Sequence, residues 1–415
     1  MDTIAEQLIS LNPWHYNPAF RQNTSKTFRD LYYLLTDSFI DKDVSLSISG
    51  LRRTGKTTIL FQMLNYLLDH KEDNLKIGYF QFSEESRNLE QILTFFFSRF
   101  SKAEVLNSSF YFLLDELQYV KDWQTILKGY IDQNPKIKFI VTGSASIYFR
   151  SQTKESLAGR ILDFRLDPLS FSEMIRLKEN HKELSSIGQI LTRGNSSHEA
   201  FKALYFDRLP FKKLLGSYLR FGEFPALLPY LNDEIYAKKY LEDGIIYKIL
   251  QKDIRLFEVE KQEEITALYK ICCSNMAQTI NLRNVASETD LSYPTIKKYV
   301  SVLSKTFLID RIKNRLRSTR AQTKSMDKVF SCSLNLASII LSFSDPLNPP
   351  YLDFKGHIVE NFVYNCLKKL GPLYYYNQAG KEVGLILELN NTILPFEVKS
   401  SSQLKKTDLN HLLSF

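Results

Sequence analysis

The stretch Gly-Leu-Arg-Arg-Thr-Gly-Lys-Thr at residues 50–57 determines which fold the sequence predicts. It follows a β-rich run at 44–48 and precedes an amphipathic helical pattern over 57–70. A glycine-bounded loop that ends in Lys-Thr, between a strand and a helix, is the pattern of a phosphate-binding P-loop. Its glycines let backbone N–H groups point towards phosphates, and the start of the helix adds partial positive charge.

The residue types in this loop predict separate roles around a bound nucleotide. The ammonium group of Lys56 would neutralise phosphate oxygens, and the hydroxyl of Thr57 would coordinate Mg²⁺. The alternative is a glycine loop in which Lys-Thr occurs by coincidence. As a P-loop, the segment predicts these nucleotide-binding residues: Gly50, Arg53, Thr54, Gly55, Lys56, Thr57 and Thr58.

Further β-rich runs alternate with helical patterns after the loop. The run at 110–114 is apolar throughout, as expected of a strand that is covered on both faces. The alternation predicts an α/β fold in which a parallel sheet is sandwiched between helices. The expected strands after the loop are 76–82, 110–114, 138–142 and 161–165, with a helix near 88–101.

Two acids, Asp115 and Glu116, follow the buried run at 110–114. Ligands of open α/β sheets bind at the carboxyl ends of the strands, which is where these acids would lie. Asp115 suits a role at Mg²⁺, directly or through water, and Glu116 is placed to orient or activate the attacking water. The alternative is an ordinary strand end with solvated acids.

Two later segments add candidate catalytic residues. Ser144 follows the strand at 138–142 and suits sensing of a γ-phosphate or positioning of water, although such a segment is also a common turn. Arg160 precedes the strand at 161–165. An arginine supplied across a subunit interface would neutralise transition-state charge, whereas an ordinary surface arginine is the alternative.

Composition narrows the class of protein. The 415 residues are 44% hydrophobic and 24% charged, which indicates a globular chain with more than one domain. The net charge of +8 suggests an anionic partner, which could be nucleotide phosphate, nucleic acid or an acidic protein surface. Four cysteines without a CxxC pair indicate a reduced compartment. With no signal sequence and no membrane-spanning stretch, we expect a cytoplasmic protein without a membrane partner.

Together these segments resemble the prokaryotic AAA+ ATPases of the origin-recognition-like branch. The relevant group carries a winged helix and a restriction-nuclease-like C-terminal domain of unknown function. The similarity spans nearly the whole chain, and the P-loop and the Leu-Ala-Gly-Arg stretch at 157–160 are the most telling parts. The matching segments are 12–14, 50–58, 114–118, 142–144, 155–160, 167–173 and 222–225.

The resemblance implies an ATP site that uses Mg²⁺. It assigns Lys56 and Thr57 to nucleotide and metal, Asp115 and Glu116 as the acidic pair, Ser144 as a sensor and Arg160 as a finger. The family commonly has two glycines before a Phe-Pro pair. Glu223 replaces one of them here, so we expect that turn to differ from the family pattern.

The second half of the chain changes to mostly helical patterns. We expect a helical lid or spacer and then a helix-turn-helix whose second helix is capped by Ser292; the resemblance implies a winged helix there. A basic run follows and could lie along DNA phosphates, or it could be a solvated face of a protein-binding winged helix. The basic residues are Arg311, Lys313, Arg315, Arg317, Arg320, Lys324 and Lys328.

The tail resembles a restriction-type nuclease, in which an acid, an Asp and a Glu-x-Lys hold Mg²⁺. Here Glu360 lies on an amphipathic helix, and Glu397 and Lys399 form the Glu-x-Lys. Gly384 stands where the Asp is expected, and the chain ends at residue 415, soon after Lys399. Both features predict a degenerate nuclease that is retained for structure or binding and not for cleavage.

The sequence thus predicts an α/β fold: a P-loop parallel sheet sandwich followed by a helical lid, a winged helix and a small α/β nuclease-like domain. The expected boundaries are 1–170, 171–260, 261–328 and 340–415. The leading functional hypothesis is an ATP-hydrolysing switch that acts on or is regulated by DNA, with a possible homo-oligomer formed through Arg160. The alternatives are an ATP-regulated nuclease, and an ATP-binding scaffold or signalling protein that contacts another protein.

Overall fold

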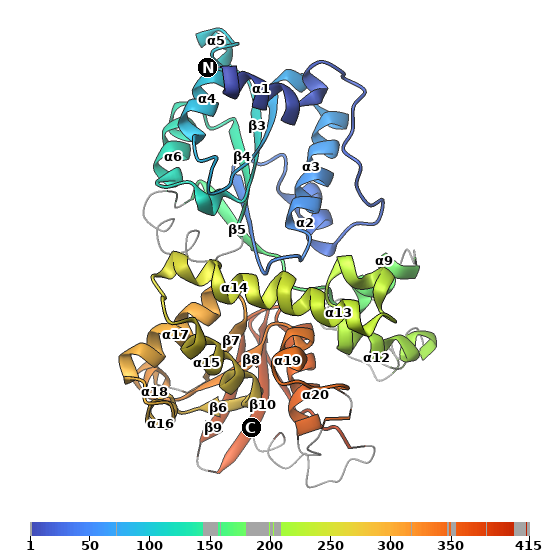
Figure 1. Cartoon of the computed structure of the whole chain (residues 1–415), viewed down its shortest axis with the longest axis vertical. Helices are drawn as coiled ribbons and strands as arrows, with labels where there is room; N and C mark the ends of the chain where they lie inside the picture. The colour runs from blue at the N-terminus through green and yellow to red at the C-terminus, as the bar shows by residue number, and fades with distance from the viewer. Residues whose placement is uncertain are drawn as a thin grey trace. The chain divides into compact units, whose positions relative to one another are not determined.

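The computed structural model divides the chain into two compact units, Met1–Asp167 and Pro168–Phe415 (Figure 1). Each unit contains its own β-sheet. The structure describes residues 2–71, 73–143, 157, 159–179, 199, 202, 209–316, 318–346, 348–349, 354–378, 380–401 and 412.

The first unit is built on a five-stranded parallel sheet of order β2–β3–β4–β1–β5. The sequence predicted a parallel sheet, and each strand begins and ends within one residue of its predicted run. Strand β4 separates β1, which leads into the P-loop, from β3, which ends at the first of the two acids, Asp115. The strands are β1 (Ser45–Ser49), β2 (Ile77–Gln81), β3 (Phe110–Asp115), β4 (Ile137–Gly143) and β5 (Ile161–Arg165).

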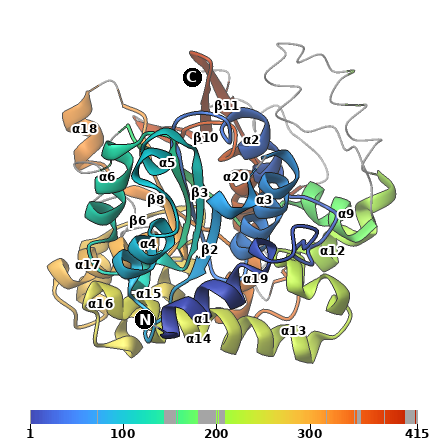
Figure 2. The same cartoon turned by 90° about the horizontal axis from the view of Figure 1, so that it is seen from above.

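Helices cover both faces of this sheet, with α2 and α3 on one face and α4 and α6 on the other (Figure 2). The helices are α1 (Asp2–Leu11), α2 (Asp30–Ser38), α3 (Lys56–His70), α4 (Leu89–Phe97), α5 (Lys102–Asn107) and α6 (Trp123–Gln133). Single 3₁₀ turns are η1 (Pro13–His15), η2 (Asn74–Lys76) and η3 (Leu117–Tyr119).

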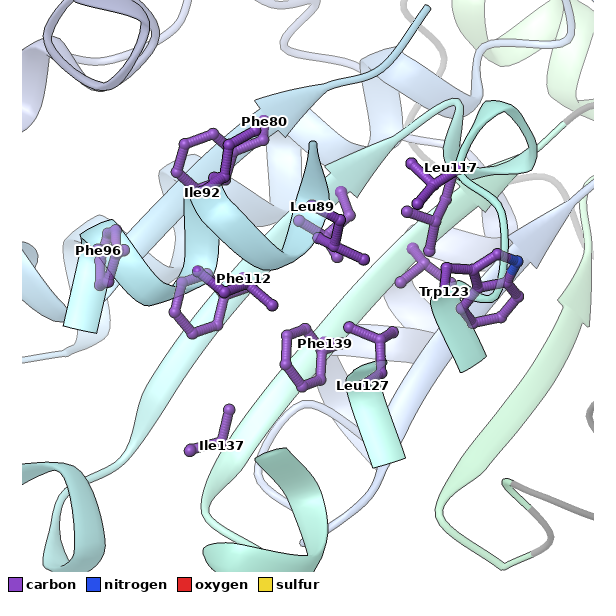
Figure 3. Close-up of a cluster of buried hydrophobic side chains, with 14 of the residues drawn as sticks. Phe80, Leu89, Ile92, Phe96, Phe112, Leu117, Trp123, Leu127, Ile137 and Phe139 are labelled. Atoms are coloured by element: carbon purple, nitrogen blue, oxygen red, sulfur yellow. The ribbon is translucent and has the colours of Figure 1, made fainter. Parts of the chain in front are cut away.

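Two hydrophobic clusters hold these layers together, one on each face of the sheet. Because side chains alternate along a strand, Phe112 of β3 enters the cluster under α4 and α6, whereas Leu113 enters the cluster under α2 and α3. Figure 3 shows Phe112 with Phe96 of α4 and Phe139 of β4, whose ring centroids lie 4.8 Å and 5.4 Å away. Burial on both faces explains why β3 is apolar throughout.

The second unit begins with helices. The first are α9 (Phe171–Glu179), α12 (Lys212–Phe221), α13 (Glu234–Leu241) and α14 (Tyr247–Gln251). A π-helical turn, η6 (Glu242–Ile246), joins α13 to α14. The 3₁₀ turns are η4 (Leu209–Phe211), η5 (Pro225–Tyr230) and η7 (Asp253–Phe257). The later helices are α15 (Gln262–Ser274), α16 (Leu282–Glu288), α17 (Tyr293–Lys305), α18 (Thr319–Lys324), α19 (Leu334–Ile340) and α20 (Phe354–Leu367).

A six-stranded sheet of order β11–β10–β9–β7–β8–β6 organises this unit. Its pairs are antiparallel except for β7 with β9. The parallel pair joins the segment predicted as winged helix to the segment predicted as nuclease-like, so both share one sheet. The strands are β6 (Gln278–Ile280), β7 (Ile309–Asn314), β8 (Asp327–Ser331), β9 (Leu373–Gln378), β10 (Lys381–Leu389) and β11 (Thr392–Phe396).

The helix-turn-helix pattern of the sequence appears as α16 and α17. The side chain of Ser292 caps α17 by accepting from the N–H of Thr295 at 3.2 Å, as predicted, and Pro294 lies in the first turn. Ile296, Val300 and Leu303 bury one face of α17 at helical spacing. Across the described residues, no helix is both long and apolar enough to cross a membrane.

Candidate functional site

The P-loop follows β1, where the backbone approaches the segment after β5 very closely. The N–H of Leu166 donates to the carbonyl of Ser49 at 2.7 Å. A Cβ atom on Gly50 would lie only 2.2 Å from the carbonyl oxygen of Leu166, so no side chain fits at this position. Gly55 has a φ of 97°, in the left-handed region, and directly precedes the first turn of α3. Both glycines of the motif are therefore required by the backbone.

Lys56 lies inside the curve of the loop. Its side chain is buried, and its Nζ donates to the carbonyls of Gly50 at 3.0 Å and Leu51 at 2.8 Å. The hydroxyl of Thr54 also donates to the carbonyl of Leu51, at 2.9 Å. The buried ammonium therefore has oxygen acceptors from the loop itself, which offsets part of its desolvation cost. Arg53 and Thr58, the other predicted phosphate contacts, are exposed.

Asp115 is fully buried at the end of β3 and receives hydrogen bonds from three elements. The hydroxyl of Thr57, on α3, donates to its Oδ2 at 2.8 Å. The hydroxyl of Thr142, on β4, donates to its Oδ1, and that of Tyr79, on β2, donates to Oδ2 at 3.4 Å. The predicted pair of Thr57 and Asp115 is thus brought together, whereas no contact with Asp115 was predicted for Thr142 or Tyr79.

Burial controls the protonation of these groups. Desolvation raises the pKa of Asp115 above its ordinary value, and the hydrogen bond from Thr142 is the largest opposing influence. Desolvation also raises the pKa of Tyr79, and the nearby charge of Asp115 adds to this increase. Tyr79 therefore remains a hydrogen-bond donor at neutral pH.

Thr57 and Asp115 form a donor set that suits Mg²⁺. Hydroxyl and carboxylate oxygens are hard ligands, and Mg²⁺ at phosphate sites is usually held by one or two carboxylates together with the substrate phosphates. The described part of the chain contains no cluster of three His, Cys, Asp or Glu side chains that could hold a metal ion. Such a cluster is not needed at a site where a nucleotide supplies the remaining oxygens.

Glu116 lies next to Asp115 but has a different environment. Its φ of 57° is in the left-handed region, and its backbone N–H donates to the hydroxyl of Thr142 at 3.1 Å. The side-chain amide of Gln118 donates to its Oε2. Thr142 and Gln118 therefore fix the backbone and the carboxylate of the acid that the sequence assigned to the attacking water. No role was predicted for Gln118, although it lies in the matching segment 114–118.

The two remaining predicted catalytic residues are not part of this cluster. Ser144 lies outside the described residues. Arg160 precedes β5, next to the start of β1, whereas the P-loop follows the other end of β1. Arg160 and the P-loop are therefore separated by the length of β1, about 16 Å. Arg160 instead pairs with Asp132, with 2.6 Å between Nε and Oδ1.

The basic run in the second unit is largely ion-paired. Arg311 and Lys313 both contact Asp327, at 3.1 Å and 2.5 Å, and Arg315 contacts Glu388 at 2.8 Å. Arg317 lies outside the described residues, while Arg320 and Lys324 lie on α18 and are exposed. Acids thus neutralise much of the charge that the run carries on β7, and α18 carries two further exposed cations. Asp327 lies within the run, next to Lys328, whereas Glu388 lies elsewhere in the sequence, so the run alone did not reveal that partner.

Lys328, which the sequence placed in the basic run, lies on β8 and contacts the nuclease-like segment. The Nζ of Lys328 lies 2.6 Å from Oε1 of Glu360 and 3.4 Å from the carbonyl oxygen of Gly384. A Cβ atom on Gly384 would lie 2.8 Å from Oε1 of Glu360. The Nζ of Lys399 pairs with Oε1 of Glu397 at 2.7 Å. Each of the two glutamates is therefore balanced by an ammonium group of the chain.

Three family models match separate parts of the chain. Residues 42–175 match a model described as an AAA domain. Residues 212–346 and 355–415 match two models that are each described as a domain of unknown function, DUF8612 and DUF4143 respectively. The first match includes the P-loop, both acids and all strands of the parallel sheet. The first unit is therefore a P-loop α/β domain of the AAA type.

Curated relatives include two proteins of Methanocaldococcus jannaschii, both described as uncharacterized. MJ1637 is 27% identical over 284 residues, which cover 66% of this chain and 58% of that protein. MJ1544 is 26% identical over 380 residues, covering 85% and 77%. An uncharacterized protein of Haemophilus influenzae is 24% identical over 299 residues, covering 69% and 66%. This chain thus spans 58% of the length of MJ1637.

Two solved structures show a distant likeness to this chain. AMPPCP-bound DnaA from Aquifex aeolicus has a TM-score of 0.30 at 14% identity and covers 71% of this chain and 92% of its own. Cdc6p from Pyrobaculum aerophilum has a TM-score of 0.30 at 10% identity, covering 79% and 97%. Neither likeness is close enough to bear on function.

Proposed function

We propose that this protein binds ATP with Mg²⁺ at the P-loop and hydrolyses it. The observation that carries the proposal is the contact between Thr57 and Asp115, which brings a hydroxyl and a buried carboxylate within 2.8 Å beside the loop. The match of residues 42–175 to an AAA domain supports it. ATP rather than GTP, and the origin-recognition-like branch, are proposed from the resemblance in sequence.

Each residue of the cluster has a proposed role. Lys56 balances charge on the β- and γ-phosphate oxygens, and the loop N–H groups bind the same phosphates. Thr57 and Asp115 hold Mg²⁺, which when bound neutralises charge that develops on the phosphates. Glu116 orients the attacking water and accepts its proton. Ser144 remains a proposed γ-phosphate sensor.

The Glu116→Gln variant tests hydrolysis separately from binding. Glutamine keeps the shape of the side chain but cannot accept a proton as a carboxylate does. We expect turnover to fall by roughly 100-fold or more, since general-base contributions are of that order, while ATP affinity stays close to wild type. Glu90→Gln, an exposed acid on α4, is the matched control. Wild-type turnover in Glu116→Gln would remove this residue from the mechanism.

We propose further that Arg160 acts on the nucleotide of a neighbouring copy in a homo-oligomer. Its place at the start of β5, about 16 Å from its own P-loop, is compatible with a contact in trans and not with one in cis. Its half-exposed side chain faces Asp132, so the ion pair would open or rearrange on assembly.

A second candidate function is DNA binding by the segment from α15 to β8. Its elements are a helix, a strand, two helices and then two strands with α18 between them. This order, together with the adjacency of β6, β8 and β7 in the sheet, supports a winged helix. We propose that Lys297 on α17 and Arg320 and Lys324 on α18 contact phosphates, because all three are exposed. The division into lid, winged helix and nuclease-like domain is part of this proposal.

Fluorescence anisotropy with duplex DNA at about 50 mM and 200 mM salt tests this function. Replacing Lys297, Arg320 and Lys324 by alanine should weaken binding and reduce its salt dependence. Lys313→Ala is the matched control, because Lys313 is already paired with Asp327. Undetectable binding at low salt would favour the alternative of a scaffold or signalling protein that contacts another protein.

For the tail we propose a structural or binding role without cleavage. The support is the position of Lys328, whose ammonium group lies between Glu360 and Gly384. An active nuclease of this type would need an aspartate and a metal ion at that place. Supercoiled plasmid incubated with Mg²⁺ or Mn²⁺ should stay intact. Cleavage that Lys399→Ala abolishes would instead establish the alternative of an ATP-regulated nuclease.

A further inference from the structure

A segment before the sheet runs along the P-loop helix α3 and is attached to it. The side chain of Asn65, on α3, accepts from the N–H of Gln22 and donates to its carbonyl, both at 2.9 Å. The side-chain amide of Gln62, also on α3, donates to the carbonyl of Ser25 at 3.0 Å. These contacts fix the backbone that leads to Arg29, the residue before α2.

Arg29 connects the P-loop to the last residue of the first unit. Its side chain is buried, with one terminal nitrogen donating to the carbonyl of Thr54 at 2.8 Å and the other to the carbonyl of Asp167 at 2.9 Å. The guanidinium group is planar and rigid, so two bonds from its two ends fix the separation of the two carbonyls. A lysine could satisfy one of them but could not bridge both with that geometry.

The segment held by Arg29 is the exit from the first unit. Leu166 is bonded to Ser49 and packs against Gly50, which has no room for a side chain there. Asp167 follows, and Pro168 begins the second unit. A residue before proline is restricted to extended conformations, so the orientation of the Asp167 carbonyl also sets the direction in which the chain leaves.

We propose that Arg29 is a positioning residue that couples occupancy of the P-loop to the exit segment at 166–168. Thr54 is in the loop that would wrap the phosphates, so any rearrangement of its peptide group on binding must be accommodated by the guanidinium group and by Asp167. This inference rests on the proposed nucleotide binding. Coupling of this kind requires a contact that differs between the two states of the loop, and the Thr54 carbonyl is that contact.

Hydrogen exchange with and without a non-hydrolysable ATP analogue and Mg²⁺ tests the coupling. Peptides over 50–58 report nucleotide binding, and peptides over 164–169 report the exit segment through amides such as that of Leu166. In the wild type we expect nucleotide to change exchange in both regions, by about fivefold or more in the exit segment. In Arg29→Gln the response of 50–58 should remain, while that of 164–169 is lost.

Two further variants complete the test. Arg29→Lys can form one of the two bonds and should give an intermediate response in the exit segment. Arg21→Gln is the matched control: Arg21 precedes Arg29 in the same segment, donates to the carbonyls of Pro18 and Leu68 and pairs with Asp69. It should behave as the wild type does.

The outcomes separate this proposal from the one on which it rests. If nucleotide leaves 50–58 unchanged in the wild type, nucleotide binding itself is wrong. If 50–58 responds in the wild type but 164–169 does not, or if 164–169 responds in Arg29→Gln as strongly as in the wild type, nucleotide binding stands and the coupling through Arg29 is overturned.

Discussion

Thr142 contacts both acids of the candidate site from the strand beside them. Its hydroxyl donates to Asp115 and accepts from the backbone N–H of Glu116 at 3.1 Å. One hydroxyl therefore satisfies a buried carboxylate and also fixes the peptide that carries the proposed catalytic acid. Because it touches the acids and not the loop, its effect should fall on turnover more than on ATP binding.

We expect Thr142→Val to lower turnover by roughly 10- to 100-fold, since a small displacement of a catalytic group has effects of that size. The Michaelis constant for ATP should change little. Steady-state hydrolysis measures both quantities. Thr36→Val is the control, because Thr36 is also buried in the first unit but bonds to carbonyls within α2. Equal losses of activity in the two variants would contradict the assigned role.

Glu223 is a buried acid in the second unit. Its carboxylate accepts from the hydroxyl of Ser333 and from the N–H groups of Leu334 at 3.1 Å and Asn335 at 3.0 Å, at the start of α19. Burial raises its pKa to about 7, and the hydrogen bond from Ser333 is the largest opposing influence. The sequence showed that this residue departs from the family pattern, but not that its side chain holds a helix.

The raised pKa gives a pH dependence with a definite sign. The native state holds the proton of Glu223 more tightly than the unfolded state, whose pKa is near 4.5. The free energy of unfolding should therefore fall as pH rises from about 4.5 to about 7, by on the order of 3 kcal/mol. Denaturant titrations of the wild type and of Glu223→Gln measure it. In Glu223→Gln the free energy of unfolding should lack this dependence on pH. The control Glu234→Gln, which changes an exposed acid, should keep it.

At the scale of elements, the turn from β1 into α3 depends on the close approach of Leu166, the residue directly after β5. Gly50→Ala would place a methyl group 2.2 Å from the carbonyl oxygen of Leu166, where the neighbour is backbone and cannot rotate away. We expect loss of ATP binding and a destabilisation of about 1–3 kcal/mol, as for overpacked sites. Equilibrium binding and chemical denaturation measure the two effects.

Gly129→Ala is the matched control for that change. Gly129 lies in α6, and a Cβ atom there would have no neighbour within 4 Å. Alanine favours a helix over glycine, so this variant should gain roughly 0.5–1 kcal/mol and keep ATP binding. Wild-type stability and binding in Gly50→Ala would show that the loop can move away from Leu166.

Strand positions in the first unit could be predicted because burial on both faces produces apolar runs, as in β3. The hydrogen-bond partners within the candidate site could not be predicted. Thr142 reaches Asp115 only because β4 lies next to β3, and strand order is not encoded in any local pattern. The P-loop was recognisable because its roles depend on residues that are adjacent in sequence. Tyr79 and Gln118 lacked such a signal.

At the scale of the whole molecule, the sequence predicted separate winged-helix and nuclease-like domains. The structure shows one sheet through both segments, joined where β7 pairs with β9 in parallel. Lys328 of β8 also reaches Glu360 of α20 across that division. These contacts join residues that are distant along the chain, so no local pattern predicts them. The two segments also match two different family models, over 212–346 and 355–415.

The proposed trans role of Arg160 gives a prediction about assembly. Arg160→Ala should lose most of its turnover while keeping ATP binding, because it would act on a neighbouring copy. Mixing Arg160→Ala with Glu116→Gln should restore part of the activity, since some interfaces then combine an intact Glu116 with an intact Arg160. Wild-type turnover by Arg160→Ala alone would make it an ordinary surface residue paired with Asp132.

ATP hydrolysis by the wild type and by Lys56→Ala, each with and without duplex DNA, tests the central claim most directly. Lys102→Ala, an exposed lysine on α5, is the control for the loss of a positive charge. We predict Mg²⁺-dependent turnover in the wild type and in the control, and its loss in Lys56→Ala with the fold intact by circular dichroism. Equal turnover in Lys56→Ala and the wild type would contradict the account.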